Sequence, residues 1–376
     1  MSLKGIWKSA LGMAALAAAC NVQAAPKGVA VTVVPEKTAL GQSDDVVVRV
    51  TITNNSGAPQ YILKSRTPFN GVEEALFEVR RDGQPVVYLG AHIKRAAPTA
   101  ADYFLLKPGA SHSVKVELSA LYDMSVSGDY QISFKQASPQ LFLATPAASG
   151  RSGAAAAFDA DDASGDNASL VSAPASVWID GRVARGQKSQ VVLDIEAMKQ
   201  AAVQPAAASL SFSKCTTSQQ TTISQAMSAG SSMASNSDAY MQRGVIGTRY
   251  TKWFGANNSS RVATVKSHFV AIKDAFANKP VTVDCGCNQN YYAYVYPTQP
   301  YKIYVCKAFW SAPMTGTDSK GGTLVHEMSH FNVVAGTDDH VYGQSGAASL
   351  AISNPAQAVD NADSHEYFAE NTPALN

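Results

Sequence analysis

The sequence lacks a strong excess of charge of either sign. Its 30 basic residues nearly balance its 29 acidic residues, and only 16% of all residues are charged. A marked basic excess would indicate nucleic acid or an anionic surface as the main partner. We therefore expect no nucleic-acid partner and no stable membrane association, and we expect a monomer. The 376 residues suffice for two domains and a connecting segment.

Long apolar runs are scarce, and the clearest one lies at the N-terminus. Residues 10–19 are apolar, follow two lysines and precede the small-residue end Val22-Gln23-Ala24. This pattern is too short for a membrane span and predicts a secretory signal peptide at residues 1–24, so we expect a secreted, extracellular protein. A lipoprotein site at Cys20 is less favoured, because Ala17 stands where leucine is expected.

Cysteine is also scarce, and paired C-x-x-C spacing is absent, which disfavours a four-cysteine zinc site. Once the signal peptide is removed, an even number of cysteines remains, which predicts two disulfides in an exported protein. Three pairings are open, although a bond between neighbours only two positions apart would be awkward. The four residues are Cys215, Cys285, Cys287 and Cys306.

One stretch carries clear chemistry, the pattern His326-Glu327-Met328-Ser329-His330. On a helix, residues four apart share a face, so His326 and His330 can hold one Zn²⁺. Glu327 projects to the side, where it can take a proton from water. The bare five-residue pattern also occurs in surface helices without a metal, so the residues that follow must show whether this one is a zinc site.

A catalytic zinc needs a third protein ligand. Val333 and Gly336 stand where a metzincin needs glycine and histidine, which excludes that class. We expect the helix to run to Ala335 and to end at Gly336 in a left-handed turn. The returning chain could then present Asp338 or Asp339 to the metal.

The block from Gly336 to Gly343 reads G-T-D-D-H-V-Y-G. Together with H-E-x-x-H it resembles the aspzincin family, the deuterolysin and peptidyl-Lys metalloendopeptidase group, from about residue 215 onward. The resemblance implies one catalytic zinc, Asp339 as the third ligand and Tyr342 as a transition-state stabiliser. It also implies the disulfides Cys215–Cys285 and Cys287–Cys306. The competing interpretations are His340 as the ligand, Asp338 as a turn cap and Tyr342 as a packed aromatic residue.

A second segment bears on the substrate. Asp363 and Glu366 would share one face of a helix, and such a pair is usually a solvated helix end. The surrounding N-A-D-S-H-E-Y-F resembles the segment of peptidyl-Lys metalloendopeptidases whose acidic pair receives a lysine ammonium. The resemblance therefore implies cleavage on the amino side of lysine. A deuterolysin-like endopeptidase without lysine preference is the main alternative.

The N-terminal half predicts a different fold. Short alternating runs separated by turn formers predict strands at residues 29–33, 46–53, 76–80, 114–118 and 130–134. We expect an all-β, immunoglobulin-like sandwich over residues 25–137. His92 and His112 are interpreted as ordinary strand or loop residues. Residues 138–207 are interpreted as a linker with two further strands, at residues 176–179 and 190–195.

Residues 208–376 predict a metallopeptidase domain, an α+β zincin that is mainly helical with a small antiparallel sheet. Helices are expected at residues 218–241 and 259–277 and from about residue 347. Strands are expected at residues 291–296 and 301–306, one of which could pair with an extended substrate.

These patterns predict a secreted zinc metalloendopeptidase that acts on proteins or peptides and is made as a latent proenzyme. The segment before the peptidase domain would be a prodomain that assists folding or blocks the cleft, and one of its lysines could fill the acidic pocket. Self-cleavage before Lys199 or Lys214 would release the enzyme. The other class considered is a non-catalytic binding or adhesion protein with a relic zinc site, but that predicts a broken motif, and the motif is intact.

Overall fold

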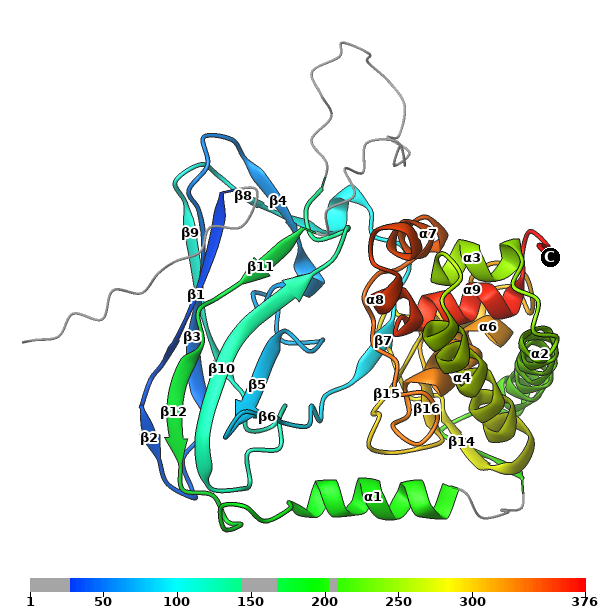
Figure 1. Ribbon diagram of the computed structural model, residues 1–376, viewed down its shortest axis with the longest axis horizontal. Helices are drawn as coiled ribbons and strands as arrows, with labels where there is room; N and C mark the ends of the chain where they lie inside the picture. Colours follow the sequence, from blue (N-terminus) through cyan, green and yellow to red (C-terminus); the bar gives the residue numbers. More distant parts are fainter. Residues whose placement is uncertain (1–27, 144–167, 203–207) are drawn as a thin grey trace, which may run out of the picture.

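The computed structural model describes residues 28–143, 168–202 and 208–376 (Figure 1). The predicted signal peptide and the middle of the predicted linker lie outside these residues. The described chain forms a β-rich N-terminal region and a mainly helical C-terminal domain, each with its own apolar core. The helix α1 (Gln190–Ala202) runs between the two along one side.

Among the described residues the β-rich region contains two larger sheets and one two-stranded sheet that share one core. Burial alternates along β10, where every second side chain faces this core, as the two-residue period of a strand requires. All five predicted strands of this region are present. The immunoglobulin-like arrangement remains a prediction. The first sheet has the order β1 (Val29–Pro35), β3 (Val47–Asn54), β9 (Ser111–Glu117), and the second β2 (Ala39–Leu40), β12 (Ala175–Ile179), β10 (Gly128–Ala137), β5 (Phe77–Arg81), β6 (Gln84–Pro85), with β11 (Ser169–Val171) beside β10.

A two-stranded sheet and two short helical turns complete the β-rich region. β4 (Gln60–Leu63) pairs with β8 (Tyr103–Leu106), and single turns of 3₁₀-helix follow β4 at Lys64–Arg66 and precede β8 at Ala100–Asp102.

The prediction of a strand at residues 190–195 is wrong, because this segment begins α1. Its valines and isoleucine suggested a strand, but the segment pairs with no described strand. Instead Ser189 accepts a hydrogen bond from Val192 N at 3.2 Å, which starts a helix. No residue of α1 is buried.

The C-terminal domain surrounds a central helix. The predicted helices at residues 218–241 and 259–277 are confirmed as α2 and α4, and the helix expected from about residue 347 begins slightly earlier, as α7. The helices are α2 (Thr217–Gln242), α3 (Thr248–Phe254), α4 (Ser259–Asn278), α5 (Lys307–Ser311), α6 (Lys320–His330), α7 (Gln344–Ser353), α8 (Pro355–Val359) and α9 (Ala362–Glu370).

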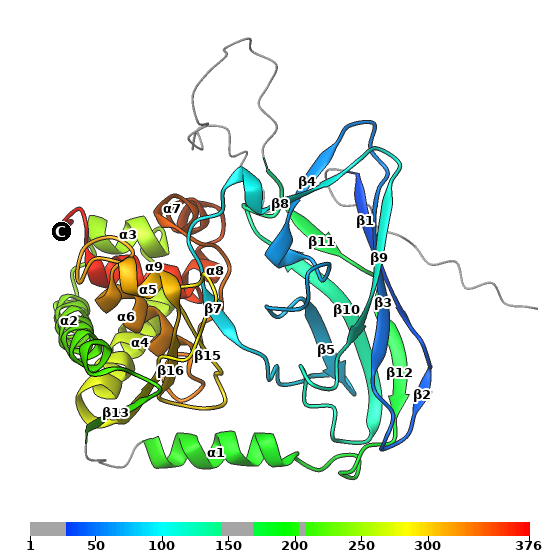
Figure 2. The same ribbon diagram turned by 180° about the vertical axis from the view of Figure 1, so that it is seen from behind.

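The sheet of this domain differs from the prediction. Its order is β13 (Ser209–Ser213), β14 (Pro280–Asp284), β16 (Lys302–Val305), β15 (Ala293–Val295), β7 (His92–Lys94). The first three strands are parallel and only β15 and β7 run antiparallel to their neighbours, so the sheet is mixed. β7 belongs to the β-rich half in sequence, yet both views place it against the helical domain (Figures 1 and 2).

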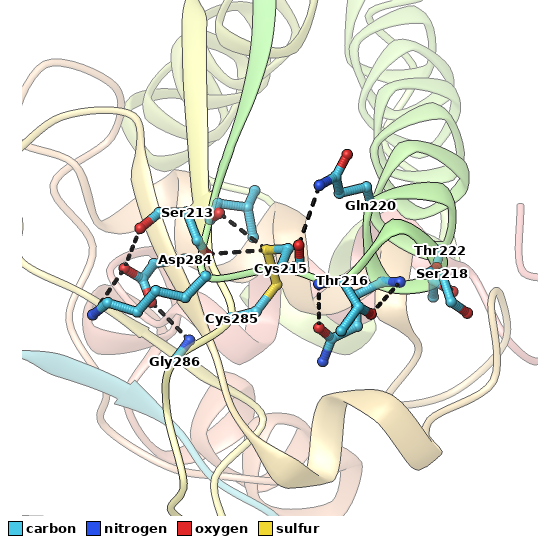
Figure 3. The surroundings of a disulfide bond; sticks show 12 residues. Ser213, Cys215, Thr216, Ser218, Gln220, Thr222, Asp284, Cys285 and Gly286 are labelled. Carbon is cyan, nitrogen blue, oxygen red and sulfur yellow. Dashed lines mark hydrogen bonds and ion pairs between the residues drawn. A yellow bond between two sulfur atoms is a disulfide. The ribbon is translucent and has the colours of Figure 1, made fainter.

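The structure confirms both disulfides implied by the resemblance, Cys215–Cys285 and Cys287–Cys306. The first joins the ends of the parallel strands β13 and β14 (Figure 3). Beside it Asp284 accepts hydrogen bonds from Ser213 Oγ at 2.9 Å and Gly286 N at 2.7 Å, and Thr216 caps α2. The entry to the helical domain is therefore held by covalent and polar contacts together.

Candidate active site

The H-E-x-x-H pattern lies on α6, which is buried along its whole length. Ser319 caps it by accepting a hydrogen bond from Gly322 N at 2.9 Å. Glycines allow neighbouring elements to approach this helix closely: a Cβ at Gly322 would lie 2.1 Å from the carboxylate of Glu370. The helix ends at His330 rather than at the predicted Ala335, because the chain returns early and Thr337 N donates to Ser329 O at 3.1 Å.

The structure brings the three predicted metal ligands together. His326 Nε2 lies 3.1 Å from His330 Nε2 and 3.2 Å from Asp339 Oδ1, and the remaining pair, His330 Nε2 and Asp339 Oδ1, is 3.5 Å apart. Ligand atoms about 2.0–2.1 Å from a tetrahedral zinc stand about 3.3–3.4 Å from one another. Among the described residues Asp339 Oδ1 also has no hydrogen-bond partner although it is buried, which suits a metal ligand. The trio therefore fits one zinc ion.

The other ring nitrogens of both histidines are held by neighbours. His330 Nδ1 lies 2.7 Å from the carbonyl oxygen of Thr337, and His326 Nδ1 lies 2.9 Å from Asp363 Oδ1. Carbonyl and carboxylate partners of this kind fix the orientation of metal-binding imidazoles.

The neighbours of Asp339 take other contacts. Asp338 Oδ1 accepts a hydrogen bond from Asp339 N at 2.8 Å, a turn-capping contact. His340 Nε2 lies 3.0 Å from Asp360 Oδ2, so its ring pairs with a surface carboxylate. Gly336 has φ +62°, which supplies the predicted left-handed turn before these residues.

Glu327 lies beside the trio. It is fully buried, and neither of its carboxylate oxygens has a hydrogen-bond partner among the described residues. Burial raises its pKa to about 7. A carboxylate whose pKa lies near neutrality is suited to accept and return a proton.

Tyr342 points its hydroxyl at backbone rather than packing as a plain aromatic residue. The hydroxyl donates a hydrogen bond to the carbonyl oxygen of Ile93 at 2.9 Å and lies 3.3 Å from Glu74 Oε1. Both Ile93 and Glu74 come from the β-rich half of the chain.

The predicted acidic pair lies on α9 and faces a lysine of β7. Lys94 Nζ lies 2.7 Å from Glu366 Oε2 and 3.1 Å from Asp363 Oδ1, and all three side chains are fully buried. Burial alone would lower the pKa of Lys94, but the two carboxylates raise it well above its ordinary value. The lysine is therefore held as a cation.

Further side chains complete this pocket. Asp318 Oδ1 lies 3.3 Å from Lys94 Nζ and accepts a hydrogen bond from the hydroxyl of Tyr367 at 2.7 Å. The rings of Tyr292 and Tyr367 have their centroids 5.3 and 5.6 Å from the ammonium. A buried cation gains from such aromatic faces as well as from carboxylates.

The chain around Lys94 is extended and pairs with a sheet edge. β7 runs antiparallel to β15, with Ile93 opposite Tyr294 and Lys94 opposite Ala293. Tyr292 N donates to the carbonyl of Lys94 at 3.1 Å, and Ile93 N donates to Asp339 Oδ2 at 3.2 Å. This is the strand addition by which extended peptides bind exposed edges.

Comparison with known proteins agrees with this geometry. The aspzincin sequence profile, described as lysine-specific metallo-endopeptidase, matches residues 239–370. An extracellular protease of Aeromonas hydrophila is 49% identical over 89% of this chain and 91% of its own length. The chain belongs to the aspzincin family. It is a zinc metalloendopeptidase that acts on protein substrates.

Two further relatives match the helical half of this aspzincin. A peptidyl-Lys metalloendopeptidase of Pleurotus ostreatus is 52% identical over 44% of this chain and 98% of its own length. The solved zinc peptidase from Grifola frondosa is 46% identical over 43% of this chain and 100% of its own, with a TM-score of 0.42.

The sequence analysis missed several side chains that the aspzincin site brings together. Lys94 carried no signal, because nothing in a short strand marks it as the partner of carboxylates 269 positions away. Asp318, just before the cap of α6, and Glu74 gave none either. His92 was interpreted as an ordinary residue, yet its ring lies against that of His330, with centroids 4.8 Å apart.

Two observations concern the surroundings of this aspzincin. Disulfides are typical of oxidising compartments, and the Aeromonas relative is named an extracellular protease. In the part of the chain that the structure describes, no helix is both long enough and apolar enough to cross a membrane.

Proposed function

We propose that this aspzincin is a secreted endopeptidase that hydrolyses peptide bonds on the amino side of lysine and is made as a latent proenzyme. The observation that carries the proposal is the salt-bridged ammonium of Lys94 between Asp363 and Glu366, next to the metal ligands. A lysine of a substrate would enter the same pocket once Lys94 has left it.

The pocket suits lysine better than arginine. Its carboxylates converge on a compact ammonium, and two tyrosine rings close it. A planar guanidinium needs paired acceptors in one plane, which is a different geometry. Asp318 is part of this proposal as a third carboxylate for the lysine side chain.

The proposed chemistry is peptide hydrolysis. When bound, zinc lowers the pKa of water toward ~7 and polarises the scissile carbonyl. Glu327 accepts the proton of the attacking water and delivers it to the leaving amine. Tyr342 donates a hydrogen bond to the developing oxyanion, a contact that matters most in the transition state. His326, His330 and Asp339 hold the metal.

The latency proposal assigns residues 25–137 and 138–207 to a prodomain and residues 208–376 to the peptidase. Of the two candidate processing sites, Lys199 is favoured over Lys214. Lys199 is exposed on α1, which has no buried residue. The carbonyl before Lys214 accepts a hydrogen bond from Cys285 N at 2.9 Å, so that peptide would have to leave a sheet before it could be cut.

An unbiased peptide library, digested by the mature protein with and without a chelator, tests the proposal. We expect chelator-sensitive cuts before lysine, identified by mass spectrometry. Chelator-sensitive cuts without lysine preference would support the deuterolysin-like alternative and remove the pocket assignment. No cuts by zinc-loaded protein would refute the proposed activity.

A further inference from the structure

The strand β7 crosses the cleft as a substrate would. Its lysine fills the acidic pocket, its backbone pairs with the edge strand β15, and the carbonyl before the lysine receives the Tyr342 hydroxyl at 2.9 Å. Under the proposed specificity, the peptide bond between Ile93 and Lys94 is the bond in register for hydrolysis.

A buried carboxylate of the prodomain lies beside that bond. Glu74 is 5% exposed, and its Oε1 is 3.3 Å from the hydroxyl of Tyr342. A tyrosine hydroxyl has one proton, so it cannot donate to Glu74 and to the Ile93 carbonyl at once. The carboxylate also lies near the oxygen on which negative charge would develop during hydrolysis, and like charges repel most strongly where water is excluded.

Two arginines hold Glu74 in this position. Arg66 Nη1 lies 2.9 Å from its Oε2, and Arg95 Nε lies 3.3 Å from its Oε1. Arg66 Nη2 in turn donates hydrogen bonds to the backbone carbonyls of Asp339 and His340, which belong to the loop that carries the third metal ligand and Tyr342. The carboxylate is thus fixed against the catalytic loop rather than free to swing away.

We propose that Ile93–Lys94 is an internal processing site of the proenzyme. We further propose that Glu74 slows its cleavage by competing with the Ile93 carbonyl for the single proton of the Tyr342 hydroxyl and by placing a negative charge beside the developing oxyanion. The inference rests on the proposed function, because it assumes that the site cleaves before lysine. Glu74 would act through Tyr342 and is therefore a positioning residue. Without its carboxylate, the hydroxyl donates to the Ile93 carbonyl without a competitor, and Arg66 and Arg95 leave a positive charge close to the developing oxyanion.

The step is an ordinary hydrolysis and consumes one water. The water oxygen bonds to the carbonyl carbon of Ile93, and the bond from that carbon to Lys94 N breaks. Both water protons end on the nitrogen of Lys94, one of them carried there by Glu327, which leaves a carboxylate at Ile93 and a protonated N-terminus at Lys94. No oxidant or co-reactant is needed.

Glu73 provides a matched control. It is the neighbouring acidic residue, and it binds Arg95 at 2.7 Å and accepts a hydrogen bond from the Tyr291 hydroxyl at 2.6 Å. Its side chain is 42% exposed. Replacing it removes the same charge and disturbs the same arginine while leaving the Tyr342–Glu74 contact in place.

The test uses full-length zinc-loaded proenzyme with Glu74→Gln, Glu74→Asp or Glu73→Gln. Glu74→Asp keeps the charge for the two arginines but withdraws it from the hydroxyl, so it serves if the amide variant folds poorly. Intact mass and N-terminal sequencing follow the fragment that begins at Lys94. We expect both Glu74 variants to form it about tenfold faster than wild type, at a rate independent of protein concentration, and Glu73→Gln to behave as wild type.

Three results would overturn the inference: no faster cleavage at Ile93–Lys94 in folded Glu74 variants, equal acceleration in Glu73→Gln, or hydrolysis of added lysyl peptides by the Glu74 variants while Ile93–Lys94 stays intact. The last result would mean that the substitution had only released β7 from the active site, without making the Ile93–Lys94 bond a substrate. The mature enzyme assayed on lysyl peptides separates this failure from a failure of the proposed function, because that activity does not involve Glu74.

Discussion

Two segments that precede the helical domain in sequence, β7 and α1, each carry a lysine near that domain. The lysine of β7 is buried, and the lysine of α1 is exposed. β7 is an extended strand whose Lys94 is fully buried among carboxylates. α1 is a helix whose Lys199 is exposed, although the helix borders a cavity that His92 and His330 also line. Figures 1 and 2 show β7 beside β15 and α1 on the outer side of the molecule.

Backbone conformation explains the difference. A strand offers free N–H and C=O groups to the edge of β15, whereas a helix satisfies its own groups and cannot extend a sheet. The lysine side chain alone therefore does not decide what the cleft holds. In this chain the extended lysine is bound, and the helix that carries Lys199 would have to unfold before that lysine could be bound in the same way.

The largest expected effect comes from removing the proposed base. Glu327→Gln keeps the shape of the side chain but cannot accept the proton, so we expect hydrolysis to fall roughly 10²–10⁴-fold. Gel analysis of the secreted chain should then show a chain that is not cut before Lys199. Normal processing of this variant would show that another protease cuts the chain.

Substitutions in the lysine pocket should have the next largest effect on activity. Glu366→Gln leaves a bound lysine short of a buried partner, and we expect kcat/KM on lysyl peptides to fall roughly a hundredfold. Asp318→Asn, on a side chain that is 33% exposed, should cost about tenfold and mainly raise KM. Zinc content measured beside activity should stay normal in Asp318→Asn, and a loss of zinc there would contradict its placement in the pocket alone.

Asp363 is a less clean probe, because it also lies 2.9 Å from His326 Nδ1. We expect Asp363→Asn to weaken zinc binding about 10–100-fold in addition to lysine selectivity. Titration with a chelator measures this directly. Unchanged zinc affinity would mean that the contact with His326 does not hold the ligand.

A smaller effect is expected from loosening α1. Ala197 is exposed in this helix, and Ala197→Gly should destabilise it by about 1 kcal/mol, which is roughly fivefold in the unfolded fraction. If the helix must unfold before cleavage, the fragment cut before Lys199 should form about fivefold faster. An unchanged rate would show that α1 is not the barrier.

A separate prediction concerns the acid stability of the helical domain. Burial lowers the pKa of His365 on α9 to about 3, so the fold favours its neutral form. Its contribution is complete above the unfolded pKa of about 6.5 and is lost as pH falls toward 3. The melting temperature should therefore drop on acidification below about pH 6.5, and it should drop less in His365→Gln. Equal pH dependence of the melting temperature in wild type and His365→Gln would contradict this.

The sequence predicted those features that depend only on residues a few positions apart. The spacing of His326, Glu327 and His330 and the turn at Gly336 could be read directly, because each depends on neighbours within a few residues. α6 ends earlier than predicted, since the returning Thr337 N donates to the carbonyl oxygen of Ser329. The parallel strands of the sheet were missed because pairing partners lie far apart in sequence.

The side chains that fill the cleft could not be predicted for the same reason. Glu74 and Lys94 meet residues of the helical domain only once the β-rich half has docked. Asp318 meets Tyr367, 49 positions further along the chain, only when the helical domain has folded. A single sequence carries no signal for such contacts. What it could supply was the expectation that some prodomain lysine fills the acidic pocket, without indicating which one.

The most direct test of the account compares uncut proenzymes that differ at Lys94. In a Lys199→Ala background, Lys94→Met keeps the side-chain length but removes the charge between Asp363 and Glu366. We expect this chain to hydrolyse added lysyl peptides at least about tenfold faster than its parent, and Lys115→Met, on exposed β9, to remain latent. A folded, zinc-loaded Lys94→Met protein as inert as its parent would contradict the claim that Lys94 in the lysine pocket keeps the enzyme closed.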